Sequence, residues 1–265
     1  MAAYTTIDNP ELYFQTKLYT GNGSTNAITL DGDENMQADM VWIKDRGRSG
    51  YNHVLNDSVR GVTKYIRPNL DSDEDTYTDA ITAFDSDGFT LGADSSNGEH
   101  NVSSQTYVAW CWKESATAGF DIVTYTGSGS PQNISHSLSA VPEFFPTKRR
   151  SGTNQWRTYH VGASDGATDY ANLDTTDAFS DSATIFNDTM PTSSVYTVST
   201  DSGINGSSET YVTYLFTGKQ GYSKFSKYTG NGNADGPFIY TGFRPAWLLL
   251  KKSSASGNTW QIFDN

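Results

Sequence analysis

The sequence has few of the features that mark several common protein classes. Cys111 is the single cysteine among 265 residues, so no disulfide can form within the chain. Lys and Arg number 18 against 30 Asp and Glu, and a chain with a net charge of −12 lacks the basic footprint that nucleic acid or an anionic membrane surface requires. The most apolar runs, 107–112 and 246–250, are too short to cross a bilayer. We therefore expect neither a nucleic-acid partner nor membrane insertion.

Metal-ligating patterns are also scarce. The histidines show no paired spacing of the His-x-x-x-His type; they are His53, His100, His136 and His160. The segment Asp71–Asp75 carries carboxylates at alternate positions, as a calcium loop does. Thr76 replaces the required glycine, however, and no glutamate closes the loop. A solvated acidic turn is the favoured interpretation, and we predict no metal site and no cofactor.

No catalytic constellation stands out. The run 127–129, Gly-Ser-Gly, lacks the strand-turn-helix context of a nucleophilic serine, and related segments carry Asn22 and Asn231 in place of Ser128. No pair of carboxylates is singled out for glycoside cleavage. Cys111 lies inside an apolar run and is expected to be a small core residue. We predict that the protein is not an enzyme and has no catalytic residues.

The residues that are abundant indicate β-structure. Aromatic residues make up 13% and charged residues only 18% of the chain, a composition that argues against disorder. Short alternating apolar runs separated by Gly-rich turns are typical of strands. The runs 107–112 and 211–216 have bulky side chains on both faces and predict central strands, and 84–89 predicts a tight acidic turn. Short helices are predicted only at 57–61 and 174–179.

Four sequence landmarks recur along the chain at intervals of roughly 100 residues. The first is a Tyr-Thr-Gly-x-Gly turn at Tyr19–Ser24, Tyr125–Ser130 and Tyr228–Asn233. The second is a short apolar run that ends at Lys44, Lys148 and Lys251. The third covers 52–55, 155–159 and 259–263, and the fourth, with a Tyr-Val start, occurs only at 107–113 and 211–216. These landmarks predict that one module has been copied along the chain.

The landmarks define the expected domain organisation. We predict an all-β fold of tandem β-sandwich repeats, jelly-roll or lectin-like, of about 100 residues each. The first unit covers 16–115, the second unit 118–218 and an incomplete third unit 221–265, after an N-terminal docking segment at 1–15. The third unit ends before its own Tyr-Val strand. It is therefore expected either to belong to a longer protein or to be completed by another unit or subunit.

Aromatic side chains are the candidate binding residues. Trp and Tyr rings stack on sugars and anchor protein interfaces. The candidates are Trp156, Tyr159, Trp260 and Phe263, together with four further tryptophans, Trp42, Trp110, Trp112 and Trp247. Most aromatic residues fall at repeated positions, where core packing is the favoured explanation. Tyr4 and Tyr13 precede the repeated pattern and are assigned to the docking segment.

Several motifs resemble a known group of proteins. Tyr19–Ser24 (YTGNGS), Asp87–Gly92 (DGFTLG) and Tyr107–Lys113 (YVAWCWK) are similar to motifs of an uncharacterised repeat family that is common in virion proteins of marine bacteriophages. The resemblance continues through 221–225 and 235–246. It implies a structural or appendage protein of a phage particle, often described as a tail fibre, and it carries no catalytic residues to this chain.

The expected function follows from the resemblance together with the repeats. We expect a virion component, a tail-fibre or appendage protein that mediates host attachment by multivalent binding. Its expected partners are other virion proteins, further copies of itself with a trimer favoured, and a host surface glycan or protein. A capsid decoration or fibre protein, a glycan-degrading tailspike and a cellular lectin-like adhesin are the alternatives.

Overall fold

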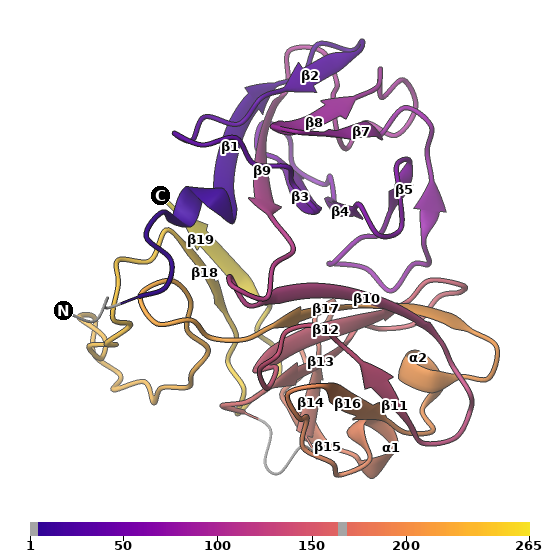
Figure 1. The fold of residues 1–265 in the computed structure, drawn as a ribbon, viewed down its shortest axis with the longest axis vertical. Coiled ribbons are helices and arrows are strands. Elements are labelled where there is room, and N and C mark those ends of the chain that lie inside the picture. The colour runs from indigo at the N-terminus through magenta and orange to yellow at the C-terminus, as the bar shows by residue number, and fades with distance from the viewer. Residues whose placement is uncertain (1–4, 164–168) are drawn as a thin grey trace.

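The computed structural model describes residues 5–163 and 169–265. Strands account for 36% of the chain and helices for 4%, so the all-β prediction is confirmed. The sheets are antiparallel and none of them closes into a barrel. Figure 1 shows the first unit in indigo and purple, the second unit below it in magenta to orange, and a yellow C-terminal hairpin beside both. None of the described helices has the length and apolar character needed to span a membrane.

The first unit is built from one four-stranded sheet and two smaller ones. The large sheet has the order β1 (Phe14–Thr20), β9 (Thr106–Trp112), β3 (Met40–Asp45), β4 (His53–Asp57). Facing it are β2 (Asn26–Ile28), β8 (Gly88–Leu91) and β7 (Ile81–Asp85), with the pair β5 (Lys64–Tyr65) and β6 (Asp75–Thr76). Alternate residues of the large sheet, such as Ile43 and Cys111, meet Phe89 in a fully buried core. As predicted, β9 is a central strand and Cys111 is a core residue.

The second unit has the same large sheet with two further strands at one edge. Its order is β10 (Phe120–Thr126), β17 (Thr210–Phe216), β12 (Phe144–Arg149), β13 (Arg157–His160), β14 (Asp169–Asn172), β15 (Ser180–Asp181). Strands β11 (Gln132–Ser135) and β16 (Val195–Val198) face this sheet. Pro146 lies within β12 and has no N–H to donate. The pairing of β12 with β17 is therefore interrupted between Phe144 and Thr147.

Local predictions were confirmed at the acidic turn but not at the helices. Residues 86–87 connect β7 to β8, and Gly88 follows with a φ of 100°, a conformation that glycine adopts without strain. Asp57 ends strand β4, residues 58–60 form a turn, and 174–179 form no helix. The described helices are η1 (Pro10–Leu12), α1 (Ala183–Phe186) and α2 (Ser202–Asn205). Helices α1 and α2 follow Ser182 and Asp201, whose side chains accept from backbone N–H groups of the first turn.

The first Tyr landmark has the same surroundings in the first two units. Tyr19 pairs with Tyr107 across β1 and β9, and Tyr125 pairs with Tyr211 across β10 and β17. The rings of each pair stack, with centroids 5.1 and 5.0 Å apart. The hydroxyl of Tyr19 donates to the His100 carbonyl at 2.7 Å, and that of Tyr125 makes the corresponding bond at 2.6 Å.

One fully buried asparagine holds the Gly-rich turn in each of these units. Asn101 accepts from the backbone N–H of Asn22 at 3.0 Å and donates to the carbonyl of Ser24 at 2.7 Å. In the second unit, Asn205 accepts from Ser128 at 2.9 Å and donates to the carbonyl of Ser130 at 2.7 Å. Each amide side chain closes the turn and also donates to a buried carbonyl outside it, that of Gly92 for Asn101 and that of Ser199 for Asn205.

The third unit contributes one hairpin, β18 (Trp247–Leu250) and β19 (Gln261–Asp264). Tyr228, the third copy of the Tyr landmark, lies outside any strand and is 53% exposed, whereas Tyr19 is 9% exposed. Its surroundings therefore differ from those of the other two copies. Tyr19 and Tyr125 each stack on a strand of their own unit, and the described residues of the third unit include no counterpart of that strand.

One apolar cluster contains residues of all three units. Residues from the large sheet of the first unit, such as Trp42 and Trp110, pack together with Trp156 of the second unit. Trp247 and Trp260 of the hairpin pack against the same cluster. The rings of Trp112 and Trp247 meet edge to face at 5.4 Å. The three units are therefore held together by aromatic packing as well as by the chain itself.

Candidate binding site at the junction of the three units

A cavity of about 390 Å³ lies where the three units meet, and we call it the junction pocket. The first unit contributes Trp42, Lys44, His53, Pro68, Asn69 and Trp110. The second unit contributes 173–176, and the hairpin contributes Leu249, Thr259, Trp260 and Ile262. A pocket of this kind, mostly apolar with a few convergent polar groups, is the usual form of a small-ligand site.

Aromatic rings form one wall of the pocket and are fixed by hydrogen bonds. The indole N–H of Trp42 donates to Nδ1 of His53 at 3.0 Å. His53 in turn stacks on Trp110, with ring centroids 6.3 Å apart. The indole N–H of Trp260 donates to the Asn172 carbonyl at 3.0 Å. These bonds fix the ring orientations, so the aromatic faces are organised before any ligand arrives.

Burial shifts the pKa of two ionisable groups that line the pocket, Lys44 and Asp174. Burial lowers the pKa of Lys44, although the Asp45 carboxylate opposes the shift. The Lys44 ammonium donates to the carbonyls of Asp45 and Tyr51 at 3.0 and 2.9 Å. Burial raises the pKa of Asp174, which accepts from the backbone N–H of Trp156 at 3.0 Å. Both groups are thus engaged by the fold and shape the pocket wall.

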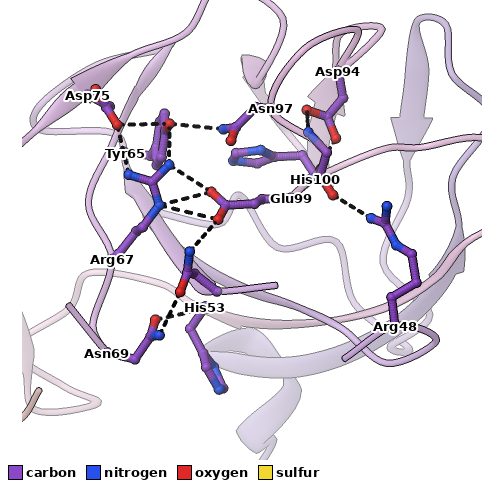
Figure 2. A network of polar contacts seen from close by, with 12 residues as sticks. Arg48, His53, Tyr65, Arg67, Asn69, Asp75, Asp94, Asn97, Glu99 and His100 are labelled. Atoms are coloured by element: carbon purple, nitrogen blue, oxygen red, sulfur yellow. Dashed lines mark hydrogen bonds and ion pairs between the residues drawn. The ribbon is translucent and has the colours of Figure 1, made fainter. Parts of the chain in front are cut away.

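A polar network centred on Arg67 adjoins the pocket residues His53 and Asn69 (Figure 2). The Arg67 guanidinium binds Glu99 at 3.0 Å and Asp75 at 2.8 Å. The Tyr65 hydroxyl accepts from Arg67 at 2.9 Å and donates to Asp75 at 3.1 Å. The side chain of Asn97 donates to the same hydroxyl at 2.9 Å. Each carboxylate of the network therefore has a cationic partner.

Two asparagines connect this network to the pocket. Asn52 donates from its side chain to Glu99 at 2.8 Å, and Asn69 donates to the Asn52 side-chain carbonyl at 2.9 Å. Asn69 also accepts from the backbone N–H of His53 at 3.0 Å. A continuous chain of hydrogen bonds thus leads from Arg67 to the pocket wall (Figure 2). Such a network rigidifies the loops that line a pocket.

His100 is the least satisfied group of the neighbourhood. It is fully buried, and neither ring nitrogen has a hydrogen-bond partner among the described residues. Its ring packs edge to face on Tyr65 at 5.4 Å, and its backbone N–H donates to Asp94 at 2.9 Å. Burial lowers the pKa of His100 to about 4 against the opposing effect of Asp94. The imidazole is therefore neutral at pH 7 and packs as an aromatic core residue.

The structure places Trp156, Tyr159, Trp260 and Phe263 in three different environments. Trp156 and Tyr159 are 0% and 1% exposed, so neither ring presents a face to solvent. Trp156 donates to the Arg67 carbonyl at 3.0 Å, and Tyr159 stacks on Phe145 at 4.6 Å. Trp260 lines the junction pocket. Phe263 is 53% exposed and is not among the residues that line the pocket.

The docking residues fall at the start of the described chain. Tyr4 lies outside the described residues. Tyr13 packs edge to face on Tyr222 at 6.4 Å, so it joins the N-terminal segment to the start of the third unit. Strand β1 already begins at Phe14.

The sequence interpretation missed most of the pocket. Of the aromatic residues that it considered for binding, Trp42, Trp110 and Trp260 line the cavity, whereas His53 and Asn69 were not proposed. One signal was present. His53 pairs with the landmark residue Lys44. Extending the registers of the other two hairpins by one residue places Trp156 opposite Lys148 and Trp260 opposite Lys251. His53 therefore occupies in the first unit the position of these tryptophans.

Comparison with known proteins gives a family but no activity. Neither a search of curated proteins nor a search of solved structures finds a match. Residues 9–265 match a single family model, described as a domain of unknown function (DUF7483). The match covers almost the whole chain, and the chain therefore belongs to the DUF7483 family.

Proposed function

We propose that the protein is a structural component of a bacteriophage virion, a tail-fibre or appendage protein that contributes to host attachment and has no catalytic role. The motifs described above support the phage assignment. The observation that carries the architectural role is the recurrence of the same contacts between successive units. The proposal includes the description of 16–115, 118–218 and 221–265 as copies of one jelly-roll-like module.

A tryptophan of each following unit contacts the preceding unit in the same way. The indole N–H of Trp156 donates to the Arg67 carbonyl at 3.0 Å, and that of Trp260 donates to the Asn172 carbonyl at 3.0 Å. Arg67 follows Ile66, which bridges Leu55, and Asn172 follows Ala171, which pairs with Thr158. The acceptors therefore hold equivalent places in the two units. Equivalent interfaces between successive copies are typical of repeat architectures.

A second contact recurs in the same manner. The Tyr214 hydroxyl of the second unit donates to the Asp57 carboxylate of the first at 2.6 Å. The Trp110 indole of the first unit donates to the Asp264 carboxylate of the third at 3.0 Å. Tyr214 and Trp110 occupy the same position on β17 and β9, each three residues after the stacked tyrosine. These contacts support a cyclic arrangement of the units around the shared core.

Buried ion pairs strengthen the junction between the first two units. Arg60, with a fully buried side chain, binds Asp57 at 2.5 Å and Glu74 at 3.2 Å. Glu74 in turn accepts from Arg150 of the second unit at 2.8 Å. A buried charge that loses its ion-pair partner costs folding free energy, so the network disfavours separation of the units. A rigid junction suits a protein whose role is to hold a shape.

The junction pocket supports a binding role for the same architecture. Its wall combines the rings of Trp42, Trp110 and Trp260 with the amide of Asn69 and the Thr175 side chain. Aromatic faces beside amide and hydroxyl groups match the alternating apolar and polar faces of a sugar. We therefore propose a host surface glycan as the ligand. Several weak sites in a homo-oligomer, with a trimer favoured, would give attachment through avidity.

The location in the particle is tested by imaging. An antibody against residues 1–265 is used to label purified phage particles for electron microscopy. The proposal predicts label on the tail or its fibres. Label on the head shell would identify a capsid decoration protein, and absence from particles would overturn the virion assignment.

The glycan proposal is tested with the soluble chain on a glycan array. Trp260→Ala is expected to reduce binding at least tenfold, because it removes a ring from the pocket wall. Phe238→Ala is the matched control, since Phe238 is 89% exposed and is not among the residues that line the pocket. Equal binding by both variants would contradict the pocket as the site. Release of sugar from the array ligands would instead identify a tailspike enzyme.

A further inference from the structure

The lysine that ends the second landmark makes two equivalent hydrogen bonds in the first and second units. Lys44 and Lys148 each donate to the carbonyl of the next residue, both at 3.0 Å. Each also donates to a carbonyl of the hairpin loop, that of Tyr51 at 2.9 Å in the first unit and that of Asn154 at 2.7 Å in the second. These bonds hold the ammonium group in the same place in both units.

A third hydrogen bond of this lysine crosses to another unit in two of the three copies. Lys148 donates to the Asp71 carbonyl of the first unit at 3.2 Å, and Lys251 donates to the Thr175 carbonyl of the second unit at 3.5 Å. Among the described residues, Lys44 makes no bond of this kind. An ammonium group carries three N–H donors. One donor of Lys44 is therefore available where the other two lysines bind a carbonyl oxygen of a neighbouring unit.

The aromatic residue opposite this lysine shows the same difference. The indole N–H groups of Trp156 and Trp260 each donate to a carbonyl oxygen of the preceding unit at 3.0 Å. His53 holds their position in the first unit, and its Nδ1 accepts from the Trp42 indole at 3.0 Å. Burial lowers the pKa of His53 to about 4, so the ring is neutral at pH 7. A neutral imidazole that accepts at Nδ1 carries its proton on Nε2, and no described residue accepts from this N–H.

Trp42 distinguishes the first unit from the other two copies at this point. Pro146 and Leu249 stand at the corresponding places, two residues before the landmark lysine. Neither side chain has an N–H group that could donate to a neighbouring ring. The pair of Trp42 and His53 is therefore specific to the first unit. Both residues line the junction pocket together with Lys44, so the two available donors belong to its wall.

The charges of the pocket wall favour an uncharged ligand. The lining residues include one basic side chain, Lys44, and one acidic side chain, Asp174. Their formal charges cancel, so neither an anion nor a cation meets a wall of opposite net charge. A ligand in the pocket meets donors from Lys44 and His53 and an acceptor from Asp174. Sugar hydroxyl groups both donate and accept, and they can satisfy a mixed set of this kind.

We propose that the junction pocket binds an uncharged sugar, and that Lys44 and His53 select it by donating to two of its hydroxyl oxygens. The sugar oxygens take the place that carbonyl oxygens of a neighbouring unit hold beside Lys148 and Trp156. Trp260 supplies an aromatic ring to the same wall. This inference rests on the proposed glycan-binding role, to which it adds the class of sugar and the two residues that recognise it.

The first experiment titrates the soluble chain with the methyl glycosides of glucose, galactose and mannose, and separately with those of glucuronic and galacturonic acid. Nuclear magnetic resonance of the imidazole nitrogens follows binding in the unaltered protein. We expect the proton of His53 on Nε2, and a shift of this nitrogen when a neutral glycoside binds. His136 is not among the residues that line the pocket, and its resonances are expected to stay unchanged. Uronates that bind as tightly as the neutral glycosides, or a His53 ring protonated on Nδ1, would overturn the inference.

Two pairs of variants test the donors one at a time. Lys44→Met keeps an unbranched side chain but removes the ammonium group, and it is expected to weaken binding of the neutral glycoside at least tenfold. Lys251→Met is the matched control, because Lys251 also donates to two carbonyls and is not among the residues that line the pocket. His53→Phe is expected to weaken binding by a similar factor, with His136→Phe as its control. Equal affinities within either pair, in variants that circular dichroism shows to be folded, would contradict the assigned donor.

The results separate this inference from the glycan proposal itself. If Trp260→Ala abolishes binding of a glycan while Lys44→Met and His53→Phe leave it unchanged, the pocket is a glycan site and the assigned donors are wrong. If only uronates bind, and do so through Trp260, the class of sugar is wrong. If the soluble chain binds neither class of glycoside and no glycan on the array, both proposals fail.

Discussion

The hydroxyl of Tyr214 donates to the carboxylate of Asp57 at 2.6 Å, although the two residues are 157 positions apart in the chain. The bond joins the central strand of the second unit to the last strand of the first sheet. Asp57 also binds Arg60 within the first unit. One carboxylate therefore ties a local turn to the boundary between two units.

Substitutions at this contact are expected to lower the free energy of unfolding by different amounts. Tyr214→Phe removes one buried hydrogen bond to a charged group and is expected to cost about 2 kcal/mol of unfolding free energy. Asp57→Asn leaves the buried Arg60 charge poorly compensated and is expected to cost about 3 kcal/mol. Urea unfolding measures both. Tyr228→Phe is the control, because Tyr228 is exposed. Equal stability of all three variants would refute the role of this contact.

The two inter-unit tryptophans provide a second test. Trp156→Phe removes the N–H that reaches Arg67 and leaves a gap in a fully buried site, so a loss of about 3 kcal/mol is expected. Trp260→Phe breaks the corresponding bond to Asn172 at a half-buried site, and about 1 kcal/mol is expected. Thermal unfolding measures the order of the two effects. A larger loss at Trp260 would be inconsistent with the burial of the two sites.

Asn101 and Asn205 are expected to be local determinants of the Gly-rich turns. Replacement by Ala removes the bonds that close the turn and takes a donor from a buried carbonyl, that of Gly92 or of Ser199, at a cost of about 2 kcal/mol or more. Hydrogen exchange should accelerate at 21–24 for Asn101→Ala and at 127–130 for Asn205→Ala. Asn231→Ala, at an exposed position, is the control. Exchange that accelerates in both turns for either variant would argue against a local clamp.

Acid is expected to destabilise the protein through its buried histidines. Burial lowers the pKa of His53 and of His100 to about 4, from an ordinary value of 6.5. Between pH 6.5 and 4 the unfolded chain takes up protons that the native chain does not, so stability falls as pH falls. At pH 5 each group is expected to cost about 2 kcal/mol.

His100→Phe tests this linkage because neither ring nitrogen of His100 has a hydrogen-bond partner among the described residues. The variant should lose less stability than the parent between pH 7 and pH 5. Urea unfolding at the two pH values measures the difference. His136→Phe is the comparison. An unchanged pH dependence in His100→Phe would contradict a buried neutral imidazole.

Glu114 is expected to act in the opposite direction. Burial, together with a hydrogen bond to Asp121, raises the pKa of Glu114 to about 7. Between pH 4.5 and 7 the native chain holds a proton that the unfolded chain has lost, so this group makes stability fall as pH rises. Glu114→Gln should remove that slope, as measured by unfolding at pH 5 and pH 7. A steeper slope in the variant would show that the sign is wrong.

The repeated landmarks made much of the fold predictable. Central strands were expected at 107–112 and 211–216 because bulky residues alternate on both faces, and β9 and β17 occupy these places. The acidic turn before Phe89 was recognisable from its residue types. Helices α1 and α2 were missed because each is four residues long and depends on its capping residue rather than on apolar periodicity.

The contacts between units could not be read from the sequence. Asp71–Asp75 has the composition of a solvated turn, yet Glu74 binds Arg150 of the second unit and Asp75 binds Arg67. Asn101 and Asn205 stand at the same place before the Tyr-Val starts at Tyr107 and Tyr211, a spacing that marks them as equivalent but does not reveal which backbone groups they bind. The roles of Glu74, Asn101 and Asn205 depend on partners that are 70 or more positions away. They become visible only when the loops are placed in space.

The central claim is that one module is repeated with equivalent contacts between its copies. A structure determination at a resolution that defines the indole rings tests it most directly. We predict that the indole N–H of Trp156 donates to Arg67 and that of Trp260 donates to Asn172, in the same orientation relative to the preceding unit. An indole of either tryptophan turned to solvent, or two unrelated orientations of the units, would contradict the claim.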